Sequence, residues 1–339
     1  MTTTKRTNAR KGAAKTGRTK TSETTKRARV PKAGERAGET SELPATTKRT
    51  ALARRARPVA LVTGGTGFLG SHLVRLLAAE GASSLRVLST SAPAWLEELG
   101  VEHVRGSITS PEDVARAVRG VSEIYHLAGR VSREREDARS MYALHVDGTR
   151  LVCDAAREAG VRSLVLASTS GTVAVTDSPE LTPDEDWTPQ LEIISRWPYY
   201  ASKLYQERVA LEHFAGAGRR LVILNPSLLL GPGDERLSST KVVLDFLARK
   251  IPTVPKGGLS FVDARDAAAA FRAAMDCGRH GERYLLGAVN WTFDEFFARL
   301  ERLTKINAPR VSLPSRLSLG GARALHTLYR HWKLTPPVE

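Results

Sequence analysis

The sequence predicts an α/β fold built on a doubly wound parallel sheet, with a smaller C-terminal region after it. Short, continuous apolar runs such as Val59–Val62 have the form of strands buried on both faces of a sheet. Segments of helical periodicity follow most of these runs, and a glycine-rich turn stands between the first run and the first helix. Strand–helix alternation of this length requires parallel strands joined by helical crossovers.

The alternation runs through most of the chain up to about Gly231. The predicted strands are short apolar runs, at Val59–Val62, Leu85–Leu88, Val101–Val104, Ile124–Leu127, Leu164–Ala167 and Leu221–Leu224. The predicted helices between them lie at Leu69–Gly81, Val114–Val118, Val146–Ala159 and Tyr200–Phe214. Beyond Gly231 we expect helices at Lys241–Lys250, Ala267–Met275 and Phe293–Thr304, and a strand at Tyr284–Leu286.

The chain divides by composition into three expected parts: residues 1–57, residues 58–232 and residues 233–339. The first part holds 17 Lys and Arg against four Glu, whereas the remainder holds 34 basic and 32 acidic side chains. Because this tail has almost no large apolar side chain, we expect it to be disordered. Its cations would suit weak contact with nucleic acid or another anionic surface, but a plain solvated extension is the better explanation.

The composition excludes several classes of protein. No run approaches the length of uncharged apolar sequence that a membrane-spanning helix needs, and no apolar leader marks secretion. Cys153 and Cys277 are the two cysteines, which indicates neither a disulfide framework nor a cysteine metal site. The eight histidines show no metal-binding spacing, so we expect no metal. These features predict a cytoplasmic protein.

The segment Thr63–Gly70, with sequence TGGTGFLG, lies where the first strand passes into the first helix. Gly64 and Gly67 allow a tight turn and let backbone N–H groups approach a pyrophosphate, and Gly70 permits close contact between helix and strand. Glycines alone are weak evidence. Their place between a buried strand and an amphipathic helix is typical of the Rossmann fold and predicts dinucleotide binding.

From this point the chain resembles the extended short-chain dehydrogenases/reductases, the NAD-dependent epimerase/dehydratase superfamily. The resemblance covers nearly all of residues 59–315. It rests on motifs that occur in order, namely TGGTGFLG, His126–Gly129 (HLAG), Val146–Thr149 (VDGT), the serine/threonine cluster Ser168–Ser170, Tyr199-x-x-x-Lys203, Asn225–Pro232 (NPSLLLGP) and Phe261–Asp266 (FVDARD). The last two are most similar to dihydroflavonol-reductase-like and 3β-hydroxysteroid-dehydrogenase-like members. The resemblance implies a Rossmann core with a C-terminal substrate-capping region.

The resemblance also implies a set of cofactor-binding residues. They come from the glycine turn and from the ends of the later strands: Gly64, Thr66, Gly67, Phe68, Leu69, Gly70, Ser89, Thr90, Ser107, Ile108, Leu127, Ala128, Gly129, Tyr199, Lys203, Pro226 and Ser227. The second strand ends in Ser89-Thr90-Ser91, where NAD-preferring relatives place an acidic residue. Its absence favours NADP over NAD, although Arg86 lies too early in the strand to meet a 2′-phosphate.

Tyr199 and Lys203 are four residues apart, so on a helix they share one face. A lysine ammonium beside the phenol, together with the charge of an oxidised nicotinamide, would lower the tyrosine pKa towards neutrality. Thr169 follows the strand Leu164–Ala167 and, by similarity, would hydrogen-bond the substrate oxygen, with Ser170 as the alternative if the register differs by one. The expected catalytic residues are therefore Tyr199, Lys203 and Thr169.

Two departures from the family pattern affect these expectations. Gly106-Ser107-Ile108 stands where relatives often carry an acidic residue that binds adenine, and His145 replaces the common Asn before VxGT. The segment around Leu224-Asn225-Pro226-Ser227 differs from the R-x-x-N-x-Y-G-P pattern of sugar-nucleotide epimerases and dehydratases. We therefore expect reduction of a ketone, or oxidation of a secondary alcohol, on an apolar small molecule.

Two alternative activities and two expectations about assembly remain open. The first alternative activity is an NAD-dependent sugar-nucleotide epimerase or dehydratase, and the second is a dinucleotide-sensing scaffold that binds nucleic acid through residues 1–57. The stretch Arg316–Lys333 has an amphipathic pattern that fits a cover over the substrate pocket or a neighbouring subunit better than a membrane surface. A homodimer formed through the long helices is common among the proteins that this chain resembles.

Overall fold

The computed structural model describes residues 59–81, 84–132, 134–178, 180–214, 216, 218–309 and 312–313. The basic tail expected at residues 1–57 and the amphipathic stretch Arg316–Lys333 lie outside the described residues. In the part of the chain that is described, no helix combines the length and the apolar character needed to cross a membrane.

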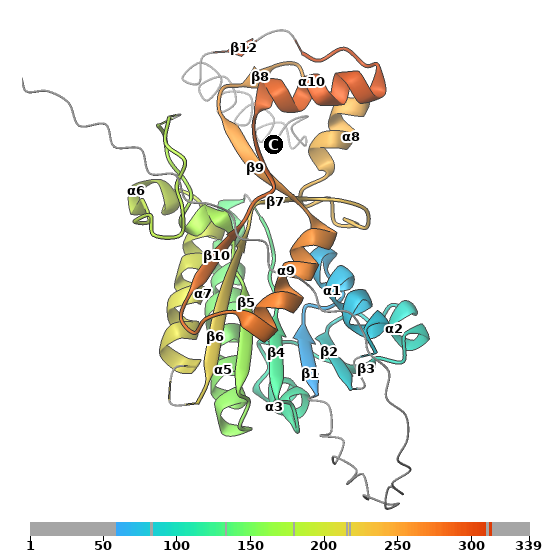
Figure 1. Cartoon of the computed structure of the whole chain (residues 1–339), viewed down its shortest axis with the longest axis vertical. Coiled ribbons are helices and arrows are strands. Elements are labelled where there is room, and N and C mark those ends of the chain that lie inside the picture. The colour runs from blue at the N-terminus through green and yellow to red at the C-terminus, as the bar shows by residue number, and fades with distance from the viewer. Residues whose placement is uncertain are drawn as a thin grey trace, which may run out of the picture. The chain divides into compact units, whose positions relative to one another are not determined.

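A seven-stranded parallel sheet forms the centre of the fold, as predicted (Figure 1). Its strands are β1 (Ala60–Thr63), β2 (Leu85–Ser89), β3 (Glu102–Arg105), β4 (Glu123–His126), β5 (Ser163–Ala167), β6 (Arg220–Pro226) and β10 (Arg283–Leu286). They lie in the order β10-β6-β5-β4-β1-β2-β3. Because the order reverses between β1 and β4, the carboxyl ends of these two strands flank the crevice where doubly wound sheets bind dinucleotides.

Helices cover both faces of this sheet. The helices α1 (Phe68–Ala79) and α9 (Ala264–Cys277) pack on one face, and the helices α3 (Pro111–Val118), α5 (Gly148–Glu158) and α7 (Pro198–Phe214) pack on the other. Successive strand residues point to opposite faces. In β1, Val62 therefore joins the first core cluster while Leu61 joins the second. Burial on both faces explains why the strands read as continuous apolar runs.

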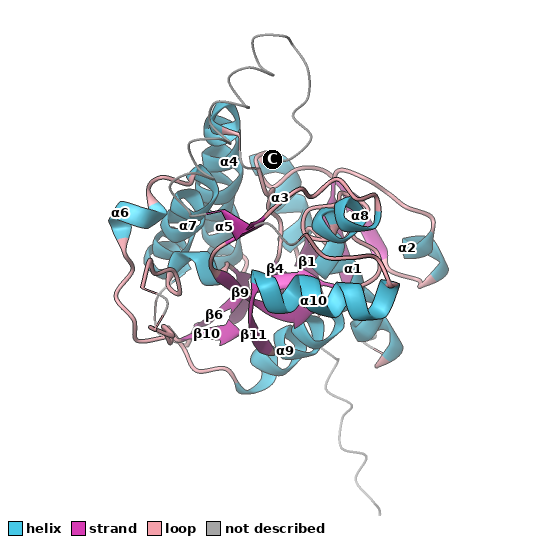
Figure 2. Ribbon diagram, turned by 90° about the horizontal axis from the view of Figure 1, so that it is seen from above, coloured by secondary structure: helices cyan, strands magenta, loops and turns pink. Residues whose placement is uncertain are grey.

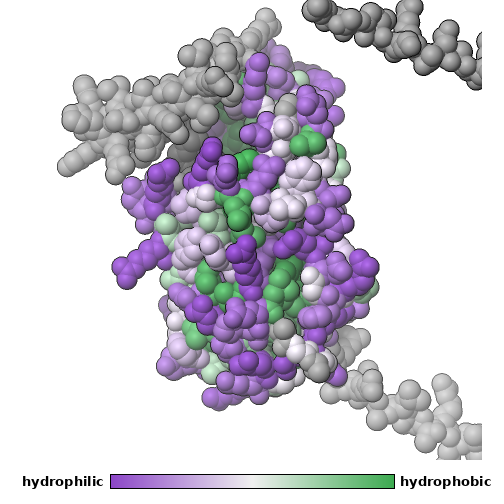
Figure 3. Space-filling model, turned by 90° about the vertical axis from the view of Figure 1, so that its left-hand side faces the viewer, coloured by the Kyte–Doolittle hydropathy of each residue, from purple (hydrophilic) through white to green (hydrophobic). Residues whose placement is uncertain are grey.

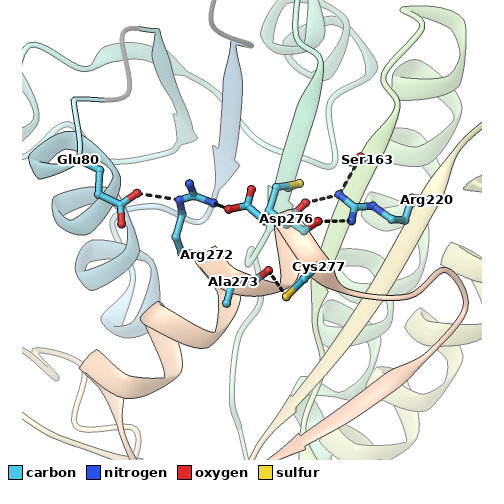
Figure 4. A network of polar contacts seen from close by, with 8 residues as sticks. Glu80, Ser163, Arg220, Arg272, Ala273, Asp276 and Cys277 are labelled. Carbon is cyan, nitrogen blue, oxygen red and sulfur yellow. Dashed lines mark hydrogen bonds and ion pairs between the residues drawn. The ribbon is translucent and has the colours of Figure 1, made fainter. Parts of the chain in front are cut away.

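Two arginines hold α9 in place (Figure 4). Arg272 forms ion pairs of 2.8 Å with Glu80, at the end of α1, and of 2.6 Å with Asp276. Arg220, the first residue of β6, donates to the carbonyl oxygens of Asp276 at 3.1 Å and Gly278 at 3.2 Å, and also to that of Met275. A cation at a helix C-terminus satisfies carbonyls that have no partner within the helix. The ion pair between Arg272 and Glu80 thereby joins α9 to α1, the helix that follows the glycine turn.

The segment after β6 forms smaller sheets and two helices. The strand order β11 (Val289–Thr292), β9 (Gly258–Asp263), β7 (Leu228–Leu230) makes a three-stranded sheet, and β8 (Val254–Pro255) pairs with β12 (Ser312–Leu313). The helices α8 (Lys241–Leu247) and α10 (Phe293–Thr304) accompany them (Figure 2). Phenylalanines fill the core of this region, and the rings of Phe261 and Phe296 stack at 5.0 Å.

The structure adds elements that the periodicity did not predict. These are the short helices α2 (Trp95–Glu98), α4 (Ala138–Tyr142) and α6 (Leu191–Ile194), the 3₁₀ turns η1 (Arg135–Asp137) and η3 (Ser170–Thr172), a π-helical turn η2 (Ala143–Asp147), and the strands β7, β8, β9, β11 and β12. Most of these elements have four residues or fewer, and such a short segment cannot show a periodic pattern of apolar residues in the sequence. In addition, β10 belongs to the main sheet and α9 packs beside α1, so the Rossmann layer extends beyond the boundary expected at residue 232.

Candidate active site

The glycine turn has the conformation that close approach to a ligand requires. Gly64 has a φ of +71°, and a Cβ atom there would lie 2.6 Å from the backbone nitrogen of Ala128. At Gly70 a Cβ atom would collide with the carbonyl oxygen of Gly64. The turn is closed by a hydrogen bond of 3.0 Å from the Gly67 N–H to the Gly64 oxygen. Only glycine fits at positions 64 and 70, as the phosphate-binding motif requires.

The N-terminus of α1 has the features that favour binding of an anion. Its N-cap residue, Gly67, has no side chain to cap the first turn, and the first turn contains no acidic residue. The amide groups of Phe68, Leu69 and Gly70 are therefore not used by a side-chain cap, and the helix dipole favours negative charge there. Leu69 contributes only its backbone, because its side chain is buried in the core. These residues fit the pyrophosphate of a dinucleotide.

The end of β2 offers two exposed hydroxyl groups rather than three. The Ser89 hydroxyl is buried, donates to the Ser91 oxygen at 2.7 Å and lies 3.0 Å from Nε2 of His103. Thr90 and Ser91 are exposed, and Ser91 Oγ lies 3.0 Å from the hydroxyl of Thr66. The side chain of Ser89 is thus occupied within the protein, so Thr66, Thr90 and Ser91 are the groups open to a ribose or its phosphate.

Arg86 is held away from that hydroxyl cluster. Its guanidinium pairs with Glu102 at 2.9 Å and donates to the carbonyl oxygens of Ala117 and Arg119, each at 2.7 Å. An arginine that is used in this way cannot also bind a 2′-phosphate, as its early place in the strand predicted.

The segment that replaces the acidic adenine-binding triplet is fixed from within. Asp113 accepts a hydrogen bond of 2.9 Å from the Ser107 N–H, and this bond is the main reason why the pKa of Asp113 lies below its usual value. The side chain of Ile108 is buried, and Gly148 leaves space for it at the start of α5. Only the backbone of Ile108 is therefore available to a cofactor, while Ser107 remains partly exposed.

The carboxyl end of β4 leads into Leu127–Gly129, a segment that lies next to Lys203 of α7. Leu127 and Ala128 are partly buried and Gly129 is exposed. A Cβ atom at Gly129 would lie 3.2 Å from Nε2 of His145 and 3.8 Å from Nζ of Lys203. Glycine at this position keeps the space above the lysine open.

The residues predicted to act together in catalysis meet at the carboxyl end of β5. Tyr199 lies in the first turn of α7, and the side chain of Thr169 is the neighbouring polar group that acts to lower the pKa of its hydroxyl. Thr169 is also the N-cap of η3, where its hydroxyl accepts from the Gly171 N–H at 3.4 Å.

Lys203 lies one turn further along α7, and its side chain is almost completely buried. Its ammonium donates to the Ala167 oxygen and to Oε1 of Gln206, each at 2.6 Å. Burial lowers the pKa of Lys203 to about 7, while the charge of Glu207 acts in the opposite direction. The lysine is therefore poised between its two protonation states near neutral pH.

The pKa of Tyr199 is raised above its ordinary value, chiefly by burial and further by Tyr200, while the bond to Thr169 opposes the rise. The lowering that we expect from Lys203 together with an oxidised nicotinamide concerns the complex. In the protein alone the pKa shows a net rise, because desolvation of a phenolate outweighs the other effects. The protonated phenol is thus the resting form.

His145, the departure from the family's Asn, forms a directed hydrogen-bond chain. Its Nε2 accepts from the Arg130 N–H at 3.0 Å, so Nδ1 carries the proton and donates to Ser202 Oγ at 2.8 Å. The Ser202 hydroxyl then donates to the Tyr199 carbonyl oxygen at 2.8 Å. Burial and the charge of Lys203 lower the pKa of His145 to about 2, so the ring is neutral. His145 therefore fixes the loop after Gly129 against the start of α7.

Of the remaining predicted positions, Pro226 is the last residue of β6 and Ser227 follows it, at the same edge of the sheet. The Ser227 N–H donates to the Leu286 oxygen at 2.9 Å, which ties this segment to β10. The Ser227 hydroxyl faces the position of Gly287. Both residues thus lie at the carboxyl end of the sheet together with the other predicted residues.

Sequence reasoning missed the buried polar residues behind this set. Gln206 and Glu207 follow Lys203 on α7, and both are fully buried together with Thr149 and Asn225. Gln206 was detectable, because a polar residue three positions after a catalytic lysine falls on the same helix face. The partners of Glu207 come from several elements, so no spacing in the sequence could reveal them.

A hollow of about 420 Å³ opens beside the segment that precedes Tyr199. Its lining comes from two nearby stretches of the chain: Thr176, Asp177, Gln190, Leu191, Glu192, Ile193 and Arg196. Figure 3 shows the face of the molecule on this side, where apolar side chains appear as separate areas among hydrophilic ones. Leu191 and Trp197 are large apolar residues that remain about half exposed, at 54% and 48%.

The sequence profile of the NAD dependent epimerase/dehydratase family matches residues 60–287. The chain belongs to this family. It is therefore an enzyme of the extended short-chain dehydrogenase/reductase type. It is 34% identical over 275 residues to a protein of Methylococcus capsulatus named sterol demethylase protein B, an alignment that covers 80% of this chain and 82% of the relative. It is 32% identical to a putative dihydroflavonol 4-reductase of Synechocystis sp., with 76% of each chain covered.

Solved structures agree with this assignment. The chain resembles the crystal structure of gox2253 with a TM-score of 0.71 and 30% identity, over 83% of this chain and 85% of that one. It resembles the UDP-glucose 4-epimerase of Thermus thermophilus in complex with NAD with a TM-score of 0.64 and 26% identity, over 75% and 85% of the two chains. The Rossmann fold predicted from the sequence is thereby confirmed.

Proposed function

We propose that this protein is an NAD(P)-dependent oxidoreductase that reduces a ketone, or oxidises a secondary alcohol, on an apolar small molecule. The observation that carries the proposal is the convergence of three groups: the side chain of Thr169 just after β5, the hydroxyl of Tyr199 and, one turn of α7 later, the buried ammonium of Lys203, which donates to the last residue of β5. The three groups lie at the carboxyl end of the sheet, the edge at which doubly wound folds bind their ligands.

A bound nicotinamide would supply or accept the hydride. In reduction the Tyr199 hydroxyl donates its proton to the carbonyl oxygen, and its raised pKa keeps that proton in place until the oxygen becomes basic. Thr169 donates a second hydrogen bond to the same oxygen as negative charge develops there. Lys203 has three N–H groups, and the described residues use two of them. The third is available for a ribose hydroxyl.

The choice of cofactor within this proposal is NADP, with NAD as the alternative. The support is the absence of an acidic residue at Ser89-Thr90-Ser91 and the exposure of the last two hydroxyl groups. An acidic side chain there would repel a 2′-phosphate, and hydroxyl groups can donate to one.

The apolar substrate class is supported by the names of two relatives, which refer to sterol demethylation and to dihydroflavonol reduction. A second candidate is a sugar-nucleotide epimerase or dehydratase that regenerates its cofactor in each turnover. The family description and the likeness to a UDP-glucose 4-epimerase favour it. Net consumption of reduced cofactor with an added ketone separates the two candidates.

The test is a screen for NADPH and NADH oxidation with steroidal and flavonoid ketones, run beside Tyr199→Phe. We expect wild-type turnover with at least one apolar ketone and a loss of at least about 100-fold in kcat for the variant, since general acid catalysis contributes that much. Tyr205→Phe, an exposed tyrosine on the same helix, is the matched control. Equal turnover of wild type and Tyr199→Phe would remove Tyr199 from the mechanism.

A further inference from the structure

The carboxylate of Glu207 is the one charged group on the buried face of α7 for which the reaction proposed above has no use. It lies one helical turn beyond Lys203 and is fully buried. Its Oε1 accepts hydrogen bonds from Thr172 at 2.7 Å, from Asn225 at 2.8 Å, and from the hydroxyl of Ser168. Its Oε2 accepts from Arg283 at 3.0 Å. Two oxygens surrounded by donors indicate the ionised carboxylate.

A buried charge is costly unless its partners are well placed, and here they are drawn from four different elements. Ser168 follows β5, Thr172 lies in η3, Asn225 lies in β6 and Arg283 lies in β10. Glu207 on α7 thus joins the carboxyl ends of β5 and β6 to Arg283, the first residue of the neighbouring strand β10. This arrangement lies directly behind the proposed catalytic residues rather than in the apolar core.

The partners of Glu207 also hold Thr169. The Asn225 amide nitrogen donates to the Thr169 carbonyl oxygen at 3.0 Å, and the Thr172 hydroxyl, whose one proton it shares with Glu207, lies 2.9 Å from the same oxygen. These two bonds fix the orientation of the Asn225 amide, because a rotation of the amide by 180° would place its oxygen against the oxygens of Thr169 and Glu207. The carboxylate therefore orients the two side chains that fix the backbone of Thr169.

The charge of Glu207 acts on Lys203 as well. The titratable groups around Lys203 are Tyr199 and Glu207 on its own helix, His126 from β4 and His145 from η2, while Arg283 from β10 faces Glu207. Both histidines are neutral, because burial, aided by the charge of Lys203, lowers their pKa values to about 3 and about 2. Glu207 is thus the negative charge that opposes the loss of the Lys203 proton.

We propose that Glu207 is a positioning residue of this active site, which fixes Thr169 and keeps Lys203 charged at the pH at which the enzyme works. The inference rests on the function proposed above. Glu207 touches neither substrate nor cofactor in this role, because it acts through Asn225, Thr172 and the field at the ammonium.

The test compares Glu207→Gln with Glu212→Gln, which removes the same charge from an exposed position of α7. We measure kcat against pH at saturating cofactor. For Glu207→Gln the decline of kcat with rising pH should move to lower pH by about one unit or more, as expected for the loss of a nearby opposite charge. Glu212→Gln should leave the profile in place. A profile that is lowered at every pH without moving would mean a structural role only and would overturn the proposal.

A second variant covers the case in which Glu207→Gln does not fold. Arg283→Gln keeps the carboxylate and removes its cationic partner, so the decline of kcat should move in the opposite direction, to higher pH. A readout without turnover is the NMR titration of the Lys203 ammonium in protein labelled on lysine nitrogen, assigned with Lys203→Arg. If no ketone is turned over, this titration still decides whether Glu207 sets the charge of Lys203. A titration midpoint that is equal in wild type and Glu207→Gln would overturn the inference.

Discussion

The ammonium of Lys203 donates a hydrogen bond of 2.6 Å to the side-chain oxygen of Gln206, three residues further along α7. Gln206 in turn donates to the Thr149 hydroxyl at 2.8 Å, and this hydroxyl lies 2.8 Å from Nε2 of His126. Nδ1 of His126 lies 2.6 Å from the hydroxyl of Thr63, at the start of the glycine turn. A continuous chain of buried polar side chains therefore joins Lys203 to the glycine turn.

From these hydrogen bonds we expect Gln206→Leu to lower kcat by about 10-fold or more, because Lys203 loses a hydrogen-bond acceptor and Thr149 loses a hydrogen-bond donor. The free energy of unfolding of this variant should fall by about 1–3 kcal/mol. Gln206→Glu, which keeps an oxygen for the ammonium, should retain more activity than Gln206→Leu. Steady-state kinetics and urea denaturation give both quantities, and equal kcat for the two variants would contradict the prediction.

The depressed pKa of Lys203 predicts a pH-dependent stability difference between wild type and Lys203→Met. Its pKa is about 7 in the folded protein against an ordinary value of 10.5, so the unfolded chain binds more protons between these limits. Wild type should therefore gain stability over the variant as the pH rises from 7 to about 10, with a slope of at most about 1.4 kcal/mol per pH unit. Below pH 7 the difference should be constant. Urea denaturation at a series of pH values measures it, and a difference that falls with rising pH would have the wrong sign.

The crowded position of Gly64 predicts a sharp contrast between two glycine variants. Gly120 has nearly the same backbone conformation, with a φ of +70°, but no atom lies within 4 Å of a Cβ placed there. Gly120→Ala should cost only the strain of about 1–2 kcal/mol. Gly64→Ala should cost more, because its Cβ meets the backbone of Ala128, and should also weaken cofactor binding. Thermal denaturation with and without NADPH distinguishes them, and equal shifts for both variants would contradict the geometry.

We expect the loss of the Arg220 guanidinium to lower the stability of the fold without changing kcat. Arg220→Met removes the donors that cap the last carbonyl groups of α9, far from the catalytic end of the sheet. We expect a loss of about 1–3 kcal/mol in unfolding free energy, since buried acceptors lose their partners. The kcat of the folded variant should equal that of wild type. A kcat reduced in proportion to stability would mean that α9 affects the site.

The amino-acid sequence by itself determined the doubly wound sheet, the glycine turn and the places of Thr169, Tyr199 and Lys203 along the chain. These features depend on local patterns, namely apolar runs, helical periods and glycines where the backbone must turn, and such patterns are written in consecutive residues. The membership of β10 in the main sheet left no such pattern, because four partly buried residues do not reveal which strand they pair with.

Only the tertiary structure decided how the site is charged and held. The partners of Glu207 lie in four elements spread over more than a hundred residues, and no spacing predicts that Ser168 and Arg283 meet on one carboxylate. Desolvation likewise raises the pKa of Tyr199 in the protein alone, whereas the lowering expected from Lys203 concerns the complex with an oxidised nicotinamide. Burial is a property of the packed fold, whereas a motif names only the groups that become buried.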